Sequence, residues 1–148
     1  MKIKYLFSSM IIVTIFLTTH AHADNAGKHI VVSDAWVQAM PPSQTTTAAY
    51  MTITNNSKKE ATLSSASTDI AGATEIHQMS DMNGMMHMAM LADVRIPAMG
   101  KLKLQPSQGF HLMLIHLKKP ANKGDIVPIT LHFRDGSSIM VNADVRDQ

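Results

Sequence analysis

The chain has 148 residues, with 13 lysine and arginine residues, 11 aspartate and glutamate residues and no cysteine. The lack of cysteine excludes a disulfide framework and a blue-copper electron carrier, which requires a thiolate ligand. Lys2 and Lys4 are the only charged residues before position 24, so the rest of the chain carries equal numbers of basic and acidic residues. This balance gives no support for binding to nucleic acid or to an anionic membrane surface.

The first 23 residues have the pattern of a secretory signal peptide. The two lysines precede an apolar run over 5–17, and the sequence AHA at 21–23 provides a small-x-small cleavage site. The run is shorter than the roughly 20 residues of a membrane-spanning helix, and a lipoprotein anchor would need a cysteine at the cleavage point. We therefore expect removal of 1–23 and a mature single domain over 24–148 that is not embedded in a membrane.

Short strands dominate the mature sequence. The stretch AAYMTIT at 48–54 is rich in β-branched and aromatic residues and ends at the turn sequence NNS. No stretch keeps a 3.6-residue apolar period over three turns, which argues against long helices. Strands are expected near 30–38, 48–54, 60–67, 73–80, 85–95, 101–104, 111–117, 127–133 and 139–145. Many short strands at intervals of about 8 to 12 residues predict an all-β, antiparallel sandwich of Greek-key type.

The last two strands form the clearest hairpin. Apolar residues alternate with other residues on both sides of the turn sequence Asp135-Gly136, so one face of the pair should be buried. The residues expected in the core are Val127, Leu131, Ile139 and Val141. Trp36 should also pack into the domain, because a side chain of that area is rarely left fully exposed.

The segment 77–90, HQMSDMNGMMHMAM, holds six of the thirteen methionines and two histidines. Thioether sulfur is a soft ligand and imidazole a borderline one, so this set favours Cu(I) over oxygen-preferring ions such as magnesium or calcium. Methionine is also a flexible filler of cores and adaptable surfaces. Composition alone leaves packing and metal binding equally open.

Asn83-Gly84 is a favoured two-residue hairpin turn and predicts the register of this segment. The expected cross-strand pairs are Met82 with Met85, Met79 with Met88, and His77 with Met90. By strand parity, one face then carries His77, Met79, Met86, Met88 and Met90. The other face carries Ser80 and His87, so His87 is not expected to be a ligand. His77 and Met88 are diagonal neighbours about 7 to 8 Å apart at Cβ, which lets both reach one ion; an irregular Met-rich loop is the alternative.

A second His/Met pair follows in the apolar sequence GFHLMLIHL at 109–117. Residues two apart in a strand share a face, so His111 and Met113 form a two-pronged ligand at the edge of the core. His116 and His132 lie out of this phase and are expected to be structural or solvent-facing.

With these residues in place, the chain resembles the PCu(A)C family of periplasmic copper chaperones, whose motif is H-x10-M-x21-H-x-M. Ten residues separate His77 from Met88, as in the motif, but 22 residues, 89–110, precede His111. We place the extra residue in the turn at 106–109. The resemblance extends over most of the mature domain, through VSDAWVQAMPP at 32–42, TAAYMTITN at 47–55, ATEIH at 73–77, RIPAMGKLKLQP at 95–106 and GFHLMLIHL at 109–117.

This resemblance implies a cupredoxin-like β-sandwich that binds one Cu(I) through His77, Met88, His111 and Met113. The possible accessory ligands are Met79, Met86 and Met90, which together with Met82 and Met85 could capture a second copper ion, guide exchange or serve in packing. We expect the protein to be periplasmic and without enzymatic activity, and we expect a monomer, although the sequence leaves the oligomeric state open. It would deliver copper to an acceptor, either a cytochrome c oxidase subunit or another copper chaperone.

Three other functions compete with delivery. Copper storage or tolerance would use the same ligands. A type-2 copper enzyme would normally gather several histidines on an open Cu(II) site, and the histidines of this sequence do not cluster. A secreted interaction domain without metal would leave the His/Met spacing unexplained.

Overall fold

The computed structural model describes residues 26–148, so the expected signal peptide at 1–23 lies outside the described residues. A short 3-10 turn, η1 (Ala26–Lys28), precedes ten strands. The strands are β1 (Ile30–Gln38), β2 (Thr46–Asn55), β3 (Ala61–Ser67), β4 (Ala71–Met82), β5 (Met85–Leu91), β6 (Val94–Ile96), β7 (Lys101–Leu104), β8 (Gly109–Leu117), β9 (Ile126–Phe133) and β10 (Ser138–Arg146). Over this part of the chain, no helix is long and apolar enough to span a membrane.

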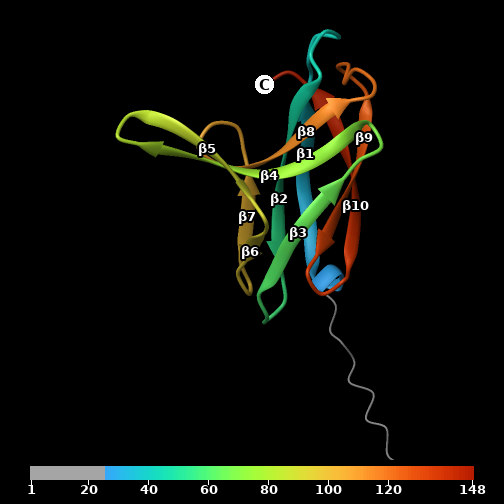
Figure 1. Cartoon of the computed structure of the whole chain (residues 1–148). Coiled ribbons are helices and arrows are strands. Elements are labelled where there is room, and N and C mark those ends of the chain that lie inside the picture. Colours follow the sequence, from blue (N-terminus) through green and yellow to red (C-terminus); the bar gives the residue numbers. More distant parts are fainter. Residues whose placement is uncertain (1–25) are drawn as a thin grey trace, which may run out of the picture.

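The strands pair in the order β5-β4-β8-β7-β2-β1-β10-β9-β3-β6, with a further pairing of β8 to β2. All pairs are antiparallel except β1 with β10 and β7 with β8. Figure 1 shows β4 and β8 crossing the long strands of the domain, with the β4–β5 hairpin extending beyond its body. The predicted all-β sandwich class is confirmed, and the sheet encloses one hydrophobic core.

Each predicted strand is present, but the one expected over 85–95 is divided. The chain bends at Ala92 and Asp93, between β5 and β6. The cause is a change of partner, because β5 pairs with β4 whereas β6 pairs with β3 at the opposite edge of the sheet. A continuous strand cannot pair at both edges of the sheet. The alternation of apolar residues does not indicate where the chain changes its partner strand.

The C-terminal hairpin has the predicted phase. Val127 and Leu131 are buried in the core, and Ile139 and Val141 are half-buried and pack against it. Leu131 lies opposite Ile139, and the Phe133 amide donates to the Ser137 carbonyl, so the turn that holds Asp135 and Gly136 spans the three residues 134–136. Full burial of a Leu or Ile side chain contributes about 1.5 to 3 kcal/mol, so a shift by one residue would expose a whole apolar face.

Trp36 in β1 packs beside Tyr50, its partner in β2, and the prediction of a packed tryptophan is confirmed. Only 9% of the residue is exposed. The centre of its ring lies 4.6 Å from the centre of the Tyr50 ring and 4.8 Å from the guanidinium carbon of Arg146. Tyr50 is the link between this stack and the cleft described next.

Candidate metal centre

Strands β4 and β8 place three of the predicted ligands, His77, His111 and Met113, on one face. Their antiparallel register sets His77 directly opposite His111, and Glu75 directly opposite Met113. Ile76, Leu112 and Leu114 point the other way and are buried in the core. Burial of those neighbours sets the phase of both strands, since side chains alternate between the faces of a sheet.

The β4–β5 hairpin brings further methionines to this face. The predicted register is confirmed, with His77 opposite Met90, Met79 opposite Met88, and Met82 opposite Met85. The turn has the positive φ angles of a type I′ turn, 58° at Asn83 and 80° at Gly84. The Gly84 amide also donates a hydrogen bond of 2.7 Å to the Asp81 carboxylate, which holds the turn closed.

A cleft of about 160 Å³ opens where these strands meet β2 and the loop after β7. It is lined by Ala48, Tyr50, Met79, Met88, Gln105, Pro106, Ser107, His111 and Met113. Three of the four predicted ligands therefore face one space, together with the accessory candidate Met79. The fourth, His77, lies beside the cleft with its ring centre 5.9 Å from that of His111. Met86 and Met90 share the face by register but lie outside the cleft lining and are more than half exposed.

The imidazole of His77 is held by Glu75. Nε2 of His77 lies 2.8 Å from the Glu75 carboxylate. A carboxylate accepts this hydrogen bond, so Nε2 carries the proton and a neutral His77 has its lone pair on Nδ1. Nδ1 is buried and has no hydrogen-bond partner among the described residues. An orphaned buried acceptor is rare in native proteins and is suited to a ligand that accepts an electron pair, such as a metal ion.

His111 is buried, with 5% of the residue exposed. Burial, and secondly the neighbouring His77, lower the pKa of His111 below its usual value of 6.5. A metal-binding imidazole must be neutral. This environment therefore keeps the ring in its ligand form at a lower pH than in a free histidine.

The lowered pKa of His111 predicts a pH-dependent stability of the metal-free protein. Around pH 6.5 the unfolded chain protonates His111 while the folded chain does not, so the unfolded state binds more protons. The free energy of unfolding should fall as the pH drops through 6.5 and level off below the folded-state pKa. Urea denaturation on both sides of this pH measures the slope, and His111→Gln should make it shallower; an unchanged slope would contradict the prediction.

The loop between β7 and β8 closes one side of the cleft. Ser107 and Gly109 adopt positive φ angles of 71° and 107°. The Gln105 amide donates to the carbonyl of Phe110 at 2.8 Å, and its side-chain amide donates to the carbonyl of Gln108 at 3.0 Å. This tight turn begins β8 at Gly109 and so orients His111. It coincides with the turn at 106–109 in which we placed the extra residue.

Sequence reasoning missed three contributors to the cleft: Glu75, Tyr50 and the 105–107 loop. Glu75 stands two residues before His77, so strand parity would have placed it on the ligand face. Tyr50 and the loop had no local signal, because they reach the cleft through the pairing of β2, β7 and β8.

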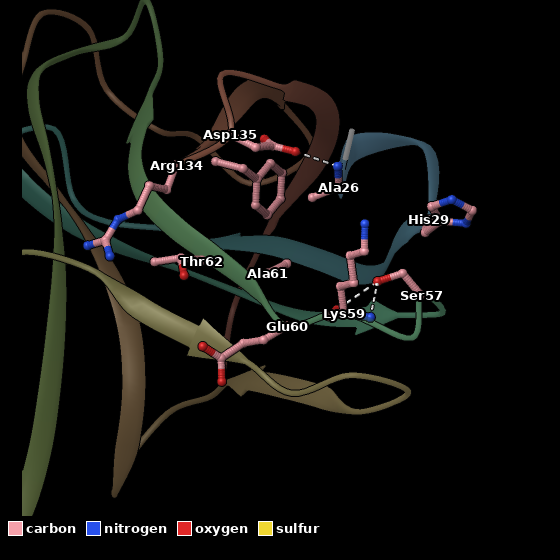
Figure 2. A pocket seen from close by; sticks show the side chains of 10 residues that line it. Ala26, His29, Ser57, Lys59, Glu60, Ala61, Thr62, Arg134 and Asp135 are labelled. Atoms are coloured by element: carbon pink, nitrogen blue, oxygen red, sulfur yellow. Dashed lines mark hydrogen bonds between the residues drawn. The ribbon is translucent and has the colours of Figure 1, made fainter. Parts of the chain in front are cut away.

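The other histidines within residues 26–148 do not face the cleft. His87 is exposed on the opposite face of the hairpin, where the register placed it. His116 is exposed, and Nε2 of His132 lies 2.9 Å from the Ser67 hydroxyl, as expected for solvent-facing or structural residues. His29 lines a separate cavity of about 340 Å³, between η1 and the turn after β9, which shares no residue with the cleft (Figure 2). Within residues 26–148, no three His, Cys, Asp or Glu side chains are grouped so as to hold a metal ion.

Comparison with solved structures defines the class of the domain as a PCuAC-type fold. The copper-bound PCuAC domain from PmoF2 superposes with a TM-score of 0.68 at 18% identity, covering 81% of this chain and 94% of that one. At this identity the likeness concerns the fold. The Cu(I) form of DR1885 from Deinococcus radiodurans is 38% identical, with a TM-score of 0.66, over 85% of this chain and 86% of that one.

The family follows from sequence comparison. The model described as putative lipoprotein LpqE-like matches residues 30–145, so the chain belongs to the LpqE-like family. A curated relative, the putative lipoprotein Lxx21020 of Leifsonia xyli subsp. xyli, is 34% identical over 131 residues, which cover 86% of this chain and 77% of that protein. The apo form of DR1885 is 35% identical, with a TM-score of 0.63, over 100% of this chain and 97% of that one.

Proposed function

We propose that the protein binds one Cu(I) in the cleft between β4, β5 and β8 and transfers it to an acceptor protein. The observation that carries this proposal is a cleft lined by soft ligands with a buried, unpartnered imidazole nitrogen next to it. Met88, His111 and Met113 line the cleft, and the orphaned Nδ1 belongs to the adjacent His77. The 38% identical relative DR1885 has a solved Cu(I) form, which supports the choice of metal.

The proposed ligand set suits Cu(I) as a cargo. Two imidazoles and two thioethers are neutral, so the complex keeps the single positive charge of the ion. His77 would bind through Nδ1, because Glu75 occupies its other nitrogen. Such a site needs no thiolate, and it therefore works in an oxidising compartment where cysteines are drawn into disulfides. We place the mature protein in the periplasm, after removal of residues 1–23.

The exposure of one ligand supports transfer rather than permanent retention. Met88 is 45% exposed, whereas His111 is 5% exposed. An acceptor's thiolate or imidazole could replace Met88 first and leave the buried histidine until last. The acceptor we propose is a cytochrome c oxidase subunit or another copper chaperone, by resemblance to the PCu(A)C family. Copper storage or tolerance is the second candidate, and it requires the same ligands but no acceptor. In both cases the protein binds copper and does not catalyse a reaction.

The first equivalent of Cu(I) should bind tightly to the purified mature protein under anaerobic, reducing conditions. X-ray absorption of this complex should show nitrogen and sulfur scatterers together, because the cleft offers both imidazoles and thioethers. A copper shell made only of nitrogen and oxygen would contradict the ligand set. Mixing the copper-loaded protein with a copper-free oxidase copper domain distinguishes delivery from storage. Delivery predicts that the copper moves to the acceptor, whereas storage predicts that it stays on this protein.

A further inference from the structure

The tip of the β4–β5 hairpin carries large apolar side chains that are more than half exposed within the described part of the chain. Pairing of β8 with β4 ends at Gly109 opposite Met79, so residues 80–87 form a two-stranded ribbon beyond the rest of the sheet (Figure 1). Met82 is 58% exposed and Met85 is 73% exposed. The sequence left core packing open as a role for these methionines. Their exposure shows that they do not pack in the core.

Register gathers two of these methionines with a histidine on the face away from the cleft. Met82 pairs directly with Met85, and Ser80 pairs with His87. Direct partners have Cβ atoms about 4.5 to 5.5 Å apart, and the diagonal between Met82 and His87 spans about 7 to 8 Å. Met85 and His87 are two residues apart on β5 and share this face. Two flexible thioethers and an imidazole therefore lie as neighbours on the outer face of the ribbon, within reach of one ion.

We infer that Met82, Met85 and His87 form a second binding site for a soft monovalent ion, Cu(I) or Ag(I). The inference rests on the proposed function, because it assumes the same ligand chemistry as in the cleft. The three residues, however, are not those of the cleft, and they lie on the opposite face of the hairpin. Thioethers and a neutral imidazole select the soft ion. The type I′ turn and the hydrogen bond from the Gly84 amide to Asp81 hold the two strands in register.

This tip site should bind more weakly than the cleft. None of its three side chains is buried, whereas His111 in the cleft is buried and His77 is oriented by Glu75. Loss of such supporting contacts typically lowers metal affinity by about 10 to 100-fold. An exposed, weaker site on a projecting ribbon is suited to capture copper and release it again.

Anaerobic titration of the mature protein with Cu(I), against a chromophoric Cu(I) chelator, tests the site. The wild type should bind two equivalents, the second about 10 to 100-fold more weakly than the first. Met82→Leu combined with Met85→Leu should abolish the second equivalent and leave the first unchanged, and His87→Ala should do the same. Met140→Leu, at a methionine that is 69% exposed on β10, is the matched control and should retain both.

Labelled methionine methyl groups identify the ligands directly by NMR. The methyl signals of Met82 and Met85 should move only with the second equivalent of Cu(I). The tip site is overturned if the wild type binds a single ion, or if the second ion survives in the double variant. A different result would overturn the proposed function and leave this inference standing. In that case copper never binds in the cleft, but it binds at the tip and is lost from the tip in the double variant.

Discussion

Replacing Met113 with leucine should weaken Cu(I) binding at the first site by about 100-fold while changing Cu(II) affinity little. Leucine keeps much of the volume and apolar character of methionine, so the half-buried position between β4 and β2 should pack nearly as before. The substitution removes the thioether, which favours Cu(I) because it is a soft ligand. Met88→Leu should act in the same direction. Competition titrations with Cu(I) and Cu(II) chelators measure the two affinities separately.

The histidines should behave differently in the same assay. Imidazole is a borderline ligand that binds both oxidation states, so His77→Ala and His111→Ala should weaken Cu(I) and Cu(II) alike. His87→Ala is the control for the first equivalent, because His87 lies on the opposite face of the hairpin. If His87→Ala abolished the first Cu(I) while Met88→Ala and Met113→Leu left it intact, the proposed cleft site would be wrong.

Removing the Glu75 carboxylate should lower Cu(I) affinity by about 10 to 100-fold although Glu75 does not bind the ion itself. Its hydrogen bond to Nε2 fixes the tautomer of His77 and leaves Nδ1 as the ligand atom. Without it, the proton can move to Nδ1 and the ring can turn. Glu75→Ala should show the full loss, and Glu75→Gln a smaller one, because the amide oxygen can still accept from Nε2.

Nitrogen NMR of the imidazole separates this positioning role from a general loss of stability. The metal-free wild type should show His77 protonated at Nε2, and Glu75→Ala should show a mixture of tautomers. Glu60→Ala is the matched control, since Glu60 is an exposed carboxylate that lies 3.7 Å from Arg95 and does not line the cleft. Wild-type affinity and an unchanged tautomer in Glu75→Ala would show that Glu75 has no such role.

Local pattern predicted much of this protein. Period-2 alternation located the strands and the buried face of the last hairpin, since each side chain's face depends on its neighbours in sequence. The Asn83-Gly84 dipeptide predicted the register of the Met-rich hairpin, because a two-residue turn with positive φ angles leaves one pairing of the flanking strands. That register also decided that Met88, and not its neighbour His87, shares a face with His77.

Only the tertiary structure decided how distant strands meet. Periodicity does not specify strand order, so it could not place His77 opposite His111, or bring Tyr50 and the 105–107 loop to the cleft. The break at Ala92 and Asp93 likewise depends on β5 and β6 pairing with opposite edges of the sheet. Whether a methionine is buried or exposed was undecidable from composition, because burial depends on what covers the strand. The structure leaves the tip of the β4–β5 hairpin uncovered, and its methionines face solvent.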